Sequence, residues 1–252
     1  MKISLITASF NSSTTIEDTF RSVEAQSFPE IEYIVADGGS VDGTLELMEK
    51  YESLISKRIS EPDDGIYDAM NKGIRMATGD VIGLINSDDM LAGPEVLSKV
   101  AEAFEDPDID VVYGDLVYVD AVDTTNVMRV WRSGEFSGRK LRYGWYPAHP
   151  TVYLRRSVYE QFGLFDLDFS LAADGEFLFR IFSRGVRACY IPQTMVRMRT
   201  GGATGQLSNV WRQNREIVRG MRKNGLSVSP LFAPIKLMNR LGQRLHGALG
   251  RW

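Results

Sequence analysis

Apolar runs and amphipathic segments alternate along the first hundred residues. The apolar runs predict strands, and the run at 81–85 is nearly free of polar residues, as expected for a strand covered on both faces of a parallel sheet. Between the runs, apolar residues recur every three or four positions, which predicts helices. The predicted strands are 3–10, 31–36, 57–60 and 81–85, and the predicted helices start near Ser13, Thr44 and Ile66. Repeated strand–helix units predict an α/β fold with a doubly wound, mostly parallel sheet.

The first predicted helix carries a recognisable start. Thr14 is followed three residues later by Glu17, the spacing of a capping box in which the two side chains satisfy free backbone N–H groups. We therefore expect this helix to begin near Ser13. Gly79 is expected to end the third helix.

The pattern changes after residue 94. A helix to about residue 104 is followed by two segments, 111–119 and 127–132, whose alternation predicts antiparallel strands. Further helices are predicted from near Ala173, over 207–223 and over 231–249. We expect residues 1–100 and 101–205 to form two halves of one domain, with 206–252 as a helical extension.

Composition excludes several classes of protein. Hydrophobic residues make up 44% and charged residues 25% of the chain, as in ordinary globular domains. Cys189 is the one cysteine, which excludes an intramolecular disulfide and a cysteine metal site and favours a cytoplasmic location. The sequence holds no run of 18 apolar residues, so no helix is expected to span a membrane.

Charge is distributed unevenly along the chain. Residues 197–252 contain 11 basic residues and one acid, Glu216, whereas residues 1–196 contain 18 basic and 32 acidic residues. This asymmetry indicates an anionic partner at the C-terminal end, such as a membrane surface or a phosphate-bearing ligand. Nucleic acid is not expected, because recognition motifs are missing and the acidic front half would repel a phosphate backbone.

Acidic turns follow three of the predicted strands. They span residues 37–44, 61–65 and 86–89. Ligands of open α/β sheets bind beyond the carboxyl ends of the strands, so these turns are expected to form one site. Hard oxygen ligands suit Mg²⁺ or Mn²⁺, which take one or two carboxylates together with substrate phosphates. Any single turn also fits an ordinary loop, since Asp and Gly are common turn residues. Neither the dinucleotide fingerprint nor the P-loop motif occurs.

These motifs, taken in order, resemble the bacterial family 2 glycosyltransferases. The resemblance rests on Asn11, the turn at 37–44, the stretch at 61–73, Gly79-Asp80 and Ser87-Asp88-Asp89. It covers about residues 1–200, and the stretch from 60 to 73 is similar to the subgroup that works in colanic acid, capsule and O-antigen assembly. The resemblance implies a GT-A fold and an inverting transfer from a nucleotide-linked sugar, UDP-linked in our interpretation, with Mn²⁺ or Mg²⁺ on the donor diphosphate.

The resemblance also implies roles for individual residues. Residues 1–100 become the donor half and 101–205 the acceptor half. Asp89 is expected to be the main metal ligand, although Ser87 replaces the first aspartate of the family's D-x-D motif. Asp88 would face the ribose or the metal. The remaining residues implied in donor binding are Thr7, Ser9, Asn11, Asp37, Asp63, Gly65 and Lys72.

A general base is needed for inverting transfer, and Asp174 is the candidate. It lies at the start of a predicted helix and matches the aspartate that serves as base in the family. The alternative is a helix N-cap, with Glu176 compensating the helix dipole. Ala173 stands where the family usually has a glutamate, and Glu176 is a possible substitute.

Four further residues are candidates for contacts with acceptor or diphosphate. His149 lies in a proline-rich loop beside Trp145, whose ring could stack on a sugar. Both also fit structural roles, as a loop histidine and a packed aromatic residue. Arg197 and Arg199 precede the glycine-rich stretch 201–205, which could approach a diphosphate closely or could serve as a flexible connector.

The last predicted helix, 231–249, is amphipathic. Apolar residues recur at spacings of three and four, and Lys236, Arg240 and Arg244 repeat beside them, followed by Arg251. This pattern is typical of an interfacial helix on anionic lipid. A helix packed on the domain or on a second subunit shows the same pattern, so a homodimer stays open. The resembling subgroup acts on saccharides carried on polyprenyl diphosphate at the inner membrane face, which implies a peripheral membrane location.

Two other classes fit parts of the sequence. A catalytically silent module that binds sugar nucleotides or glycans would share the fold, but Asp89 and Asp174 are both present. A nucleotidyltransferase that makes sugar nucleotides would need a glycine- and arginine-rich loop after the first strand, where residues 8–12 read Ala-Ser-Phe-Asn-Ser. A metal-dependent inverting glycosyltransferase is therefore the prediction.

Overall fold

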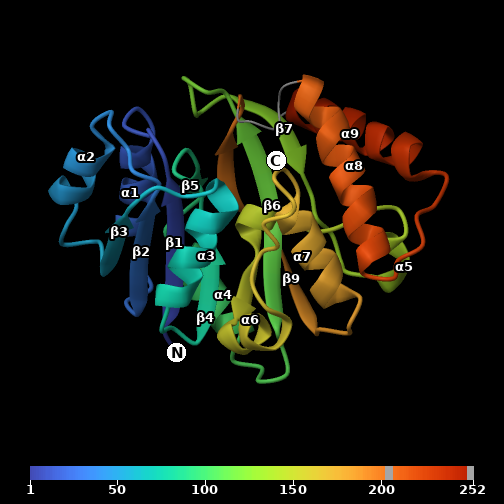
Figure 1. Ribbon diagram of the computed structural model, residues 1–252, viewed down its shortest axis with the longest axis horizontal. Coiled ribbons are helices and arrows are strands. Elements are labelled where there is room, and N and C mark those ends of the chain that lie inside the picture. The colour runs from blue at the N-terminus through green and yellow to red at the C-terminus, as the bar shows by residue number, and fades with distance from the viewer. Residues whose placement is uncertain (202–206, 249–252) are drawn as a thin grey trace.

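All strands join one mixed sheet, seen in the computed structural model that describes residues 1–201 and 207–248 (Figure 1). The strand order is β3-β2-β1-β4-β8-β6-β9-β5, and β7 pairs with β6 beside this path. The strands are β1 (Ile3–Ser9), β2 (Ile31–Asp37), β3 (Lys57–Ser60), β4 (Val81–Leu84), β5 (Met90–Leu91), β6 (Val111–Val119), β7 (Val127–Trp131), β8 (Tyr153–Arg155) and β9 (Ala188–Arg199).

Helices cover both faces of this sheet. They are α1 (Ile16–Glu24), α2 (Thr44–Lys50), α3 (Ile66–Met76), α4 (Val96–Ala103), α5 (Gly138–Leu141), α6 (Arg156–Phe162), α7 (Ala173–Phe182), α8 (Leu207–Lys223) and α9 (Phe232–Ala248), with a 3-10 helix at His149–Thr151. Residues 202–206, which hold most of the glycine-rich stretch, and 249–252, which include Arg251, lie outside the described residues.

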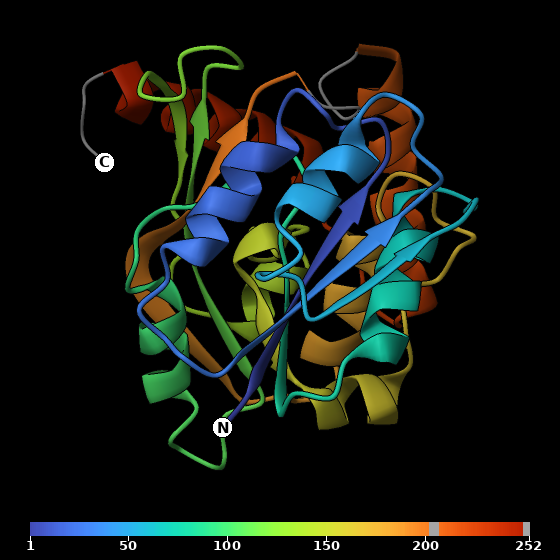
Figure 2. The same ribbon diagram turned by 90° about the vertical axis from the view of Figure 1, so that its left-hand side faces the viewer.

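The first four strands are parallel, as predicted. β1 pairs with β2 and with β4, and β2 pairs with β3, all in parallel register. Successive side chains of β1 point to opposite faces, so Ile3 and Leu5 pack under α1, α2 and α4, while Ile6 packs under α3. Figure 2 shows these helices on the two sides of the strands. The parallel pairing brings the carboxyl ends of the four strands to one edge.

The close packing of α3 on the sheet requires a glycine. Any side chain at Gly73 would collide with the side chain of Ile6 on β1. The helix therefore lies near enough to β1 for residues of its first turns to reach the strand ends. This approach decides where Tyr67 and Asn71 of α3 lie in the site described below.

The second half of the sheet is only partly as predicted. β6 and β7 are antiparallel, which confirms that prediction. The sequence did not reveal β5, β8 or β9, and β9 pairs in parallel with β6. Pro192 and several polar residues interrupt β9, so its sequence lacks the alternation of a strand. The continuous sheet makes both halves parts of one fold.

The predicted start of the first helix is wrong. The helix α1 begins at Ile16, and no side chain caps its N-terminus. Glu17 does not reach back to form a capping box; its carboxylate instead lies 2.7 Å from Lys50 Nζ and 3.0 Å from Arg21 Nη2. These partners, one of them on α2, compete successfully for the carboxylate that the local pattern assigned to the cap.

The helices predicted from Ala173 and over 207–223 are confirmed as α7 and α8, and the last helix is α9. α8 packs on α7, and α9 packs along β7. Over the described residues, no helix is both long enough and apolar enough to cross a membrane.

Candidate active site

The acidic turns meet at the carboxyl edge of β1 to β4, which we call the donor edge. Side chains link neighbouring strand ends there. Ser12 Oγ after β1 lies 2.8 Å from Ser87 Oγ after β4. Gly38 after β2 is so close to the Asp63 carboxylate after β3 that any side chain at Gly38 would collide with it. The three turns are far apart along the chain, but they form one continuous edge, as the sequence predicted.

Asp37 is the centre of the turn after β2. Its carboxylate accepts hydrogen bonds from the hydroxyls of Ser40 at 2.5 Å, Ser60 at 2.7 Å and Ser9 at 2.9 Å. It also accepts from the backbone N–H groups of Gly39 and Ser40 at 3.0 and 2.8 Å. Burial by itself raises the pKa of Asp37, but these hydrogen bonds outweigh it and hold the pKa below its ordinary value. Asp37 thus stays ionised and joins the ends of three parallel strands.

Thr7 corrects the predicted set of donor-binding residues. It is fully buried, and its hydroxyl lies 2.8 Å from the Tyr33 hydroxyl inside the core. Alternate residues of a strand face opposite sides, and Thr7 faces the helices of the α1 side. It presents no surface to a bound nucleotide.

Phe10 is a residue of the donor edge that the sequence did not single out. Its ring is 61% exposed just after β1 and lies against Gly38. At the end of an apolar run, a phenylalanine is expected to be in the core, so nothing in the sequence revealed it. Asn11 follows with a positive φ of 48°, and its Oδ1 accepts a hydrogen bond from Val41 N at 3.0 Å. The structure brings Phe10 and Asn11 beside the turn of Asp37.

The turn between β3 and α3 contains Asp63 and Gly65. Gly65 has a φ of 105°, which favours glycine, and its N–H donates to Asp63 Oδ1 at 2.8 Å. Lys72 lies further along α3. Its Nζ donates to the Pro62 carbonyl at 2.8 Å and lies 3.0 Å from Glu61 Oε1. Lys72 therefore fixes and neutralises this acidic turn, and the hydrogen bond to Glu61 raises its pKa above the ordinary value.

The acidic pair after β4 divides into a buried and a partly exposed carboxylate. Asp89 is fully buried; its Oδ1 accepts from the Arg199 backbone N–H at 3.1 Å and its Oδ2 from Asn86 Nδ2 at 2.9 Å. Burial, together with the charge of Asp88, raises the pKa of Asp89 well above its ordinary value. Asp88 is only partly buried. Of the pair, Asp88 offers the carboxylate at the donor edge, while Asp89 holds the end of β9.

This donor set fits a divalent cation bound jointly with phosphates. The described residues contain no group of three or more His, Cys, Asp or Glu side chains that could hold a metal by themselves. Mg²⁺ and Mn²⁺ commonly take one or two protein carboxylates and complete their coordination with water and substrate phosphate. Asp88, the partly exposed carboxylate of the pair, is an oxygen ligand of the kind that this mode uses.

Asp174 lies in the first turn of α7, and its alternative role as an N-cap is wrong. The N-cap position is Ala172, and no side chain caps the helix. The Asp174 Oδ1 atom instead accepts a hydrogen bond from the Tyr67 hydroxyl at 2.8 Å. Tyr67 is two residues beyond Gly65 of the donor edge, so this bond ties Asp174 to that edge. The family motif contained Tyr67, but the sequence gave no partner for it.

His149 lies near Asp174 as well. Burial lowers the pKa of His149, and the charge of Asp174 opposes this shift. The imidazole is therefore held neutral at neutral pH, with its ring 5.5 Å from the ring of Phe165, centroid to centroid. The structure thus brings together Asp174, Tyr67 and His149 from three separate segments.

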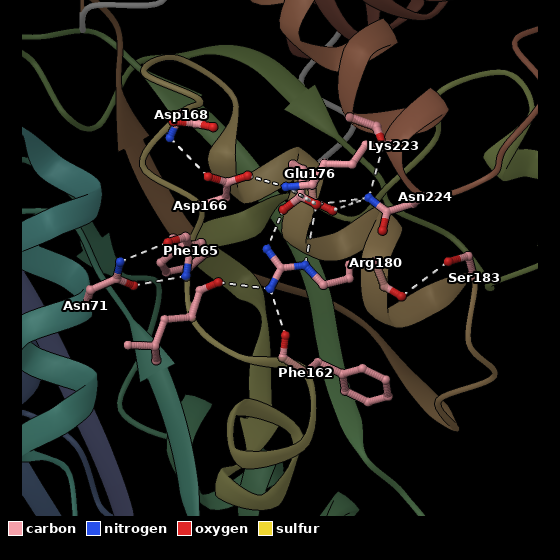
Figure 3. Close-up of polar contacts among 12 residues, drawn as sticks. Asn71, Phe162, Phe165, Asp166, Asp168, Glu176, Arg180, Ser183, Lys223 and Asn224 are labelled. Atoms are coloured by element: carbon pink, nitrogen blue, oxygen red, sulfur yellow. Dashed lines mark hydrogen bonds and ion pairs between the residues drawn. The ribbon is translucent and has the colours of Figure 1, made fainter.

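The loop before α7, residues 163–172, is fixed from two other helices. Asn71 of α3 accepts from the Phe165 N–H at 3.0 Å and donates to the Phe165 carbonyl at 2.9 Å, as Figure 3 shows. Glu216 of α8 accepts from the N–H groups of Leu171 and Ala172 at 2.8 and 3.0 Å. Since Asp174 follows two residues later, its position depends on both helices.

Glu176 does not take the place of the family's missing acid. Its side chain is fully buried and forms an ion pair with Arg180, and Asn224 Nδ2 donates to its Oε1 at 3.0 Å (Figure 3). Arg180 in turn donates to the carbonyls of Phe162 and Leu164 at 2.8 and 2.9 Å. Glu176 is therefore a structural ion that joins α7 to α8 and to the loop, and it is not available to an acceptor.

Protein contacts engage Trp145 and the two arginines, and Arg199 Nη1 also donates to the Asp88 carbonyl at 2.7 Å. Trp145 Nε1 donates to the Ser133 carbonyl at 3.0 Å, and its ring packs on aromatic neighbours in the core. Arg197 donates to the Thr124 carbonyl. Arg199 is buried and pairs with Asp18, which fixes β9 beside α1. Tertiary contacts occupy all three side chains that the sequence left free for a substrate.

The fold and these residues define a class of protein. A mixed, mostly parallel sheet with helices on both faces, an acidic donor edge and a carboxylate tied to it is the GT-A-like arrangement of nucleotide-sugar glycosyltransferases. The family model described as Glycosyl transferase family 2 matches residues 4–170, and the chain belongs to this family. The protein is a glycosyltransferase. The matched range ends before Asp174.

Curated relatives agree with this assignment. The uncharacterized glycosyltransferase Rv1514c of Mycobacterium tuberculosis is 36% identical over 185 residues, which cover 71% of this chain and 68% of the relative. A PGL/p-HBAD biosynthesis glycosyltransferase of Mycobacterium bovis is 29% identical over 184 residues, covering 71% of this chain and 69% of the relative.

Solved structures share the fold. S. aureus TarS 1–349 in complex with UDP-GlcNAc superposes with a TM-score of 0.65 at 19% identity, covering 88% of this chain and 66% of that one. The mannosyltransferase PcManGT from Pyrobaculum calidifontis, in complex with GDP-Man and Mn²⁺, gives a TM-score of 0.66 at 21% identity. The match covers 99% of this chain and 74% of that one. Against the longer TarS chain, this chain spans 40% of the length.

Proposed function

We propose that the protein is a metal-dependent inverting glycosyltransferase that moves a sugar from a nucleotide diphosphate, UDP in our proposal, to a saccharide. The observation that carries this proposal is the hydrogen bond from Tyr67 to Asp174, because it links a carboxylate beyond the sheet to the donor edge, two residues from Gly65. A base and a donor site in such direct connection are what a single-displacement transfer requires.

The donor edge would hold the nucleotide. Phe10 presents an exposed ring for stacking on a nucleobase. Asp37 and Ser9 shape the turn beside it, and Asn11, Asp63, Gly65 and Lys72 fix the neighbouring turns. Support for a nucleotide-sugar donor comes from TarS with UDP-GlcNAc and PcManGT with GDP-Man, which share the fold. We propose residues 1–100 as the donor half and 101–205 as the acceptor half.

Asp88 and Asp89 would hold Mn²⁺ or Mg²⁺ together with the donor diphosphate. We propose Asp88 as the carboxylate that meets the metal first, since it is the partly exposed member of the pair. Asp89 would act beside it or through the hydrogen bonds that fix the end of β9. The bound cation would supply positive charge to the leaving diphosphate.

Asp174 would accept the proton from the acceptor hydroxyl. As that oxygen bonds to the anomeric carbon, the bond from this carbon to the diphosphate breaks on the opposite face, and the configuration inverts. Tyr67 donates to Asp174 Oδ1, which leaves Oδ2 for the acceptor. Neutral His149 lies nearby without adding a charge that would compete for the carboxylate. Asn71 and Glu216 are positioning residues, because they fix the loop that carries Asp174.

The acceptor is proposed to be a lipid-linked saccharide of bacterial surface polysaccharide assembly, on a polyprenyl diphosphate at the inner face of the membrane. One curated relative is named for PGL/p-HBAD biosynthesis. The basic extension from residue 206 supports a peripheral membrane location, since it carries most of the positive charge of residues 197–252.

A panel of nucleotide sugars tests the proposal. The purified full chain is incubated with each sugar nucleotide in Mn²⁺, in Mg²⁺ and in EDTA, and release of the nucleoside diphosphate is followed with and without saccharide acceptors. We expect one donor to be hydrolysed slowly with metal and faster when an acceptor is present. Binding of donors without any release under all conditions would identify a silent binding module instead.

A further inference from the structure

The helices α8 and α9 enclose a groove outside the catalytic fold. Its volume is about 1180 Å³, and its walls come from α8 and from the first turns of α9. Lys236 Nζ on α9 donates to Asn214 Oδ1 on α8 at 2.7 Å, which holds the helices in this arrangement. In Figure 1 the pair lies at the end of the molecule opposite β3 and α2. This groove is separate from the donor edge.

Cations without partners line the groove. Arg212, Arg215 and Arg222 are exposed and make no hydrogen bond or ion pair within the described part of the chain. Glu216 is the one acid along the groove, and the N–H groups of Leu171 and Ala172 already occupy its carboxylate. The three arginines are therefore left to attract an anion from outside the protein.

Large apolar side chains are exposed on the same two helices. Trp211 and Leu237 line the groove. Trp211 is 76% exposed, and a row along α9 that begins at Leu237 is exposed by more than half. The row consists of Leu237 at 61%, Met238 at 70%, Leu241 at 52% and Leu245 at 63%. Burying side chains of this kind is favourable, and a contiguous exposed row of them marks an interaction surface.

The two observations together identify the partner. Arginines and an exposed tryptophan on one helix, with a row of leucine and methionine on its neighbour, are the composition of a helix surface that lies at the boundary of headgroups and acyl chains. Nucleic acid would match the arginines but not the aliphatic row. A second copy is the alternative occupant, and the oligomeric state measured below tests it.

We propose that the α8–α9 surface docks the protein on a bilayer of anionic phospholipid. Trp211 and the α9 row enter the headgroup boundary, and Arg212, Arg215 and Arg222 contact lipid phosphates. The inference deepens the peripheral location in the proposed function and rests on it. Because Glu216 of α8 also holds the loop before Asp174, docking places the base helix next to the surface from which a lipid-linked acceptor arrives.

Vesicle sedimentation of the full chain tests this docking surface. We expect the protein to sediment with vesicles of phosphatidylglycerol and phosphatidylcholine, to stay in solution with phosphatidylcholine alone, and to dissociate as salt is raised. The pair Arg212→Ala and Arg215→Ala should weaken binding by about tenfold or more, since each cation near an anionic surface contributes about 1 kcal/mol. The matched pair Arg58→Ala and Arg75→Ala removes the same charge from exposed positions elsewhere and should bind as the wild type does.

A second pair of variants separates lipid from protein partners. Leu237→Ser with Leu241→Ser should reduce sedimentation even at low salt, with the thermal unfolding midpoint near that of the wild type. Sedimentation velocity without lipid should show the same oligomeric state for both. If the wild type self-associates and this variant does not, a second copy occupies the surface and the proposal is overturned.

The assay also separates this inference from the catalytic proposal. Vesicle binding is measured without donor or acceptor, and donor hydrolysis is measured without lipid. Equal vesicle binding by the groove pair and the control pair overturns the docking surface and leaves the transfer reaction untouched. A chain that binds vesicles through α8 and α9 but releases no nucleoside diphosphate from any donor overturns the catalytic proposal alone.

Discussion

Two carboxylates of this protein, Asp37 at the donor edge and Asp174 on α7, are held in different ways. Asp37 accepts hydrogen bonds from two backbone N–H groups and the Ser40 hydroxyl within the next three residues, and from Ser9 and Ser60 at the ends of adjacent strands. Asp174 receives its hydrogen bond from Tyr67, 107 residues earlier in the chain. Its loop is fixed by Glu216, 45 residues after Leu171. The donor edge is thus built by local turns on parallel strands, whereas the base is built by packing between distant helices.

This difference indicates how each site should respond to change. A turn that is fixed by its own residues and by the adjacent strand ends tolerates variation in the helices around it. A base that depends on α3 and α8 loses its position when either helix loses a contact. Substitutions at the donor edge should therefore change donor affinity and stability. Substitutions around the base should change turnover.

The largest effect is expected for Asp174→Asn. The amide keeps the shape of the side chain but cannot accept the proton, so kcat should fall by about 10² or more while donor affinity stays near the wild-type value. Kinetics and donor titration calorimetry on the same preparation measure both. Asp168→Asn, an exposed aspartate of the same loop, is the control and should stay fully active. Wild-type turnover in Asp174→Asn would remove this residue from the role of base.

The next effect is expected at the acidic pair. Asp88→Ala should cost about 50-fold, or roughly 2 kcal/mol, of the gain in nucleoside diphosphate affinity that Mn²⁺ provides, with little change in thermal unfolding. Asp89→Ala should lose the gain and also unfold at lower temperature, because it leaves Asn86 and the Arg199 N–H without a partner. Calorimetry in Mn²⁺ and in EDTA measures the gain, with Asp64→Ala as the exposed control. Equal wild-type affinity in both buffers would falsify the metal role.

A smaller effect on turnover is expected for Glu216→Ala. Its loss leaves two backbone N–H groups before Asp174 without an acceptor, so the base shifts and kcat should fall by about tenfold with the donor KM unchanged. Glu216→Gln retains an acceptor oxygen and should recover most of the loss. A purely structural role predicts instead that kcat, KM and the unfolding temperature change together in both variants, and that pattern would contradict the assignment.

The smallest effect is expected for Asp37→Asn, and it concerns how the free energy of unfolding depends on pH. Its folded-state pKa lies below the ordinary value, so the unfolded chain binds more protons as pH falls between the two values. The stabilisation is therefore complete above about pH 5 and is lost as pH falls through the lower, folded-state pKa. Asp37→Asn should lower the free energy of unfolding at neutral pH by about 1 kcal/mol and flatten this acid dependence.

Urea unfolding at neutral and at acidic pH checks the Asp37 prediction. Asp64→Asn, in the next acidic turn, serves as control and should follow the wild type. An acid dependence in Asp37→Asn as steep as that of the wild type would show that another carboxylate carries it. Turnover is measured at neutral pH on the same proteins. An unchanged kcat shows that the substitution at the donor edge leaves the base in position.

The sequence determined the parts of the protein that depend on short-range order. The period of apolar residues defines β1 to β4, α3, α7 and α8, because burial on one or two faces imposes those periods. The parallel order then places the turns at Asp37, Asp63 and Asp88 on one edge. The resemblance identified the family, and the family model confirms it over residues 4–170.

Only the tertiary structure decided which polar side chains remain available to a ligand. Thr7, Trp145, Glu176 and Arg199 looked available in the sequence, yet each is buried or bonded to a residue from a distant segment. Conversely, Phe10 appeared to belong to the core and is exposed. Burial and long-range hydrogen bonds depend on how elements cross in space, and residue spacing along the chain carries no record of those crossings. For the same reason the sequence contained Tyr67 and Glu216 but could not show that both act on Asp174.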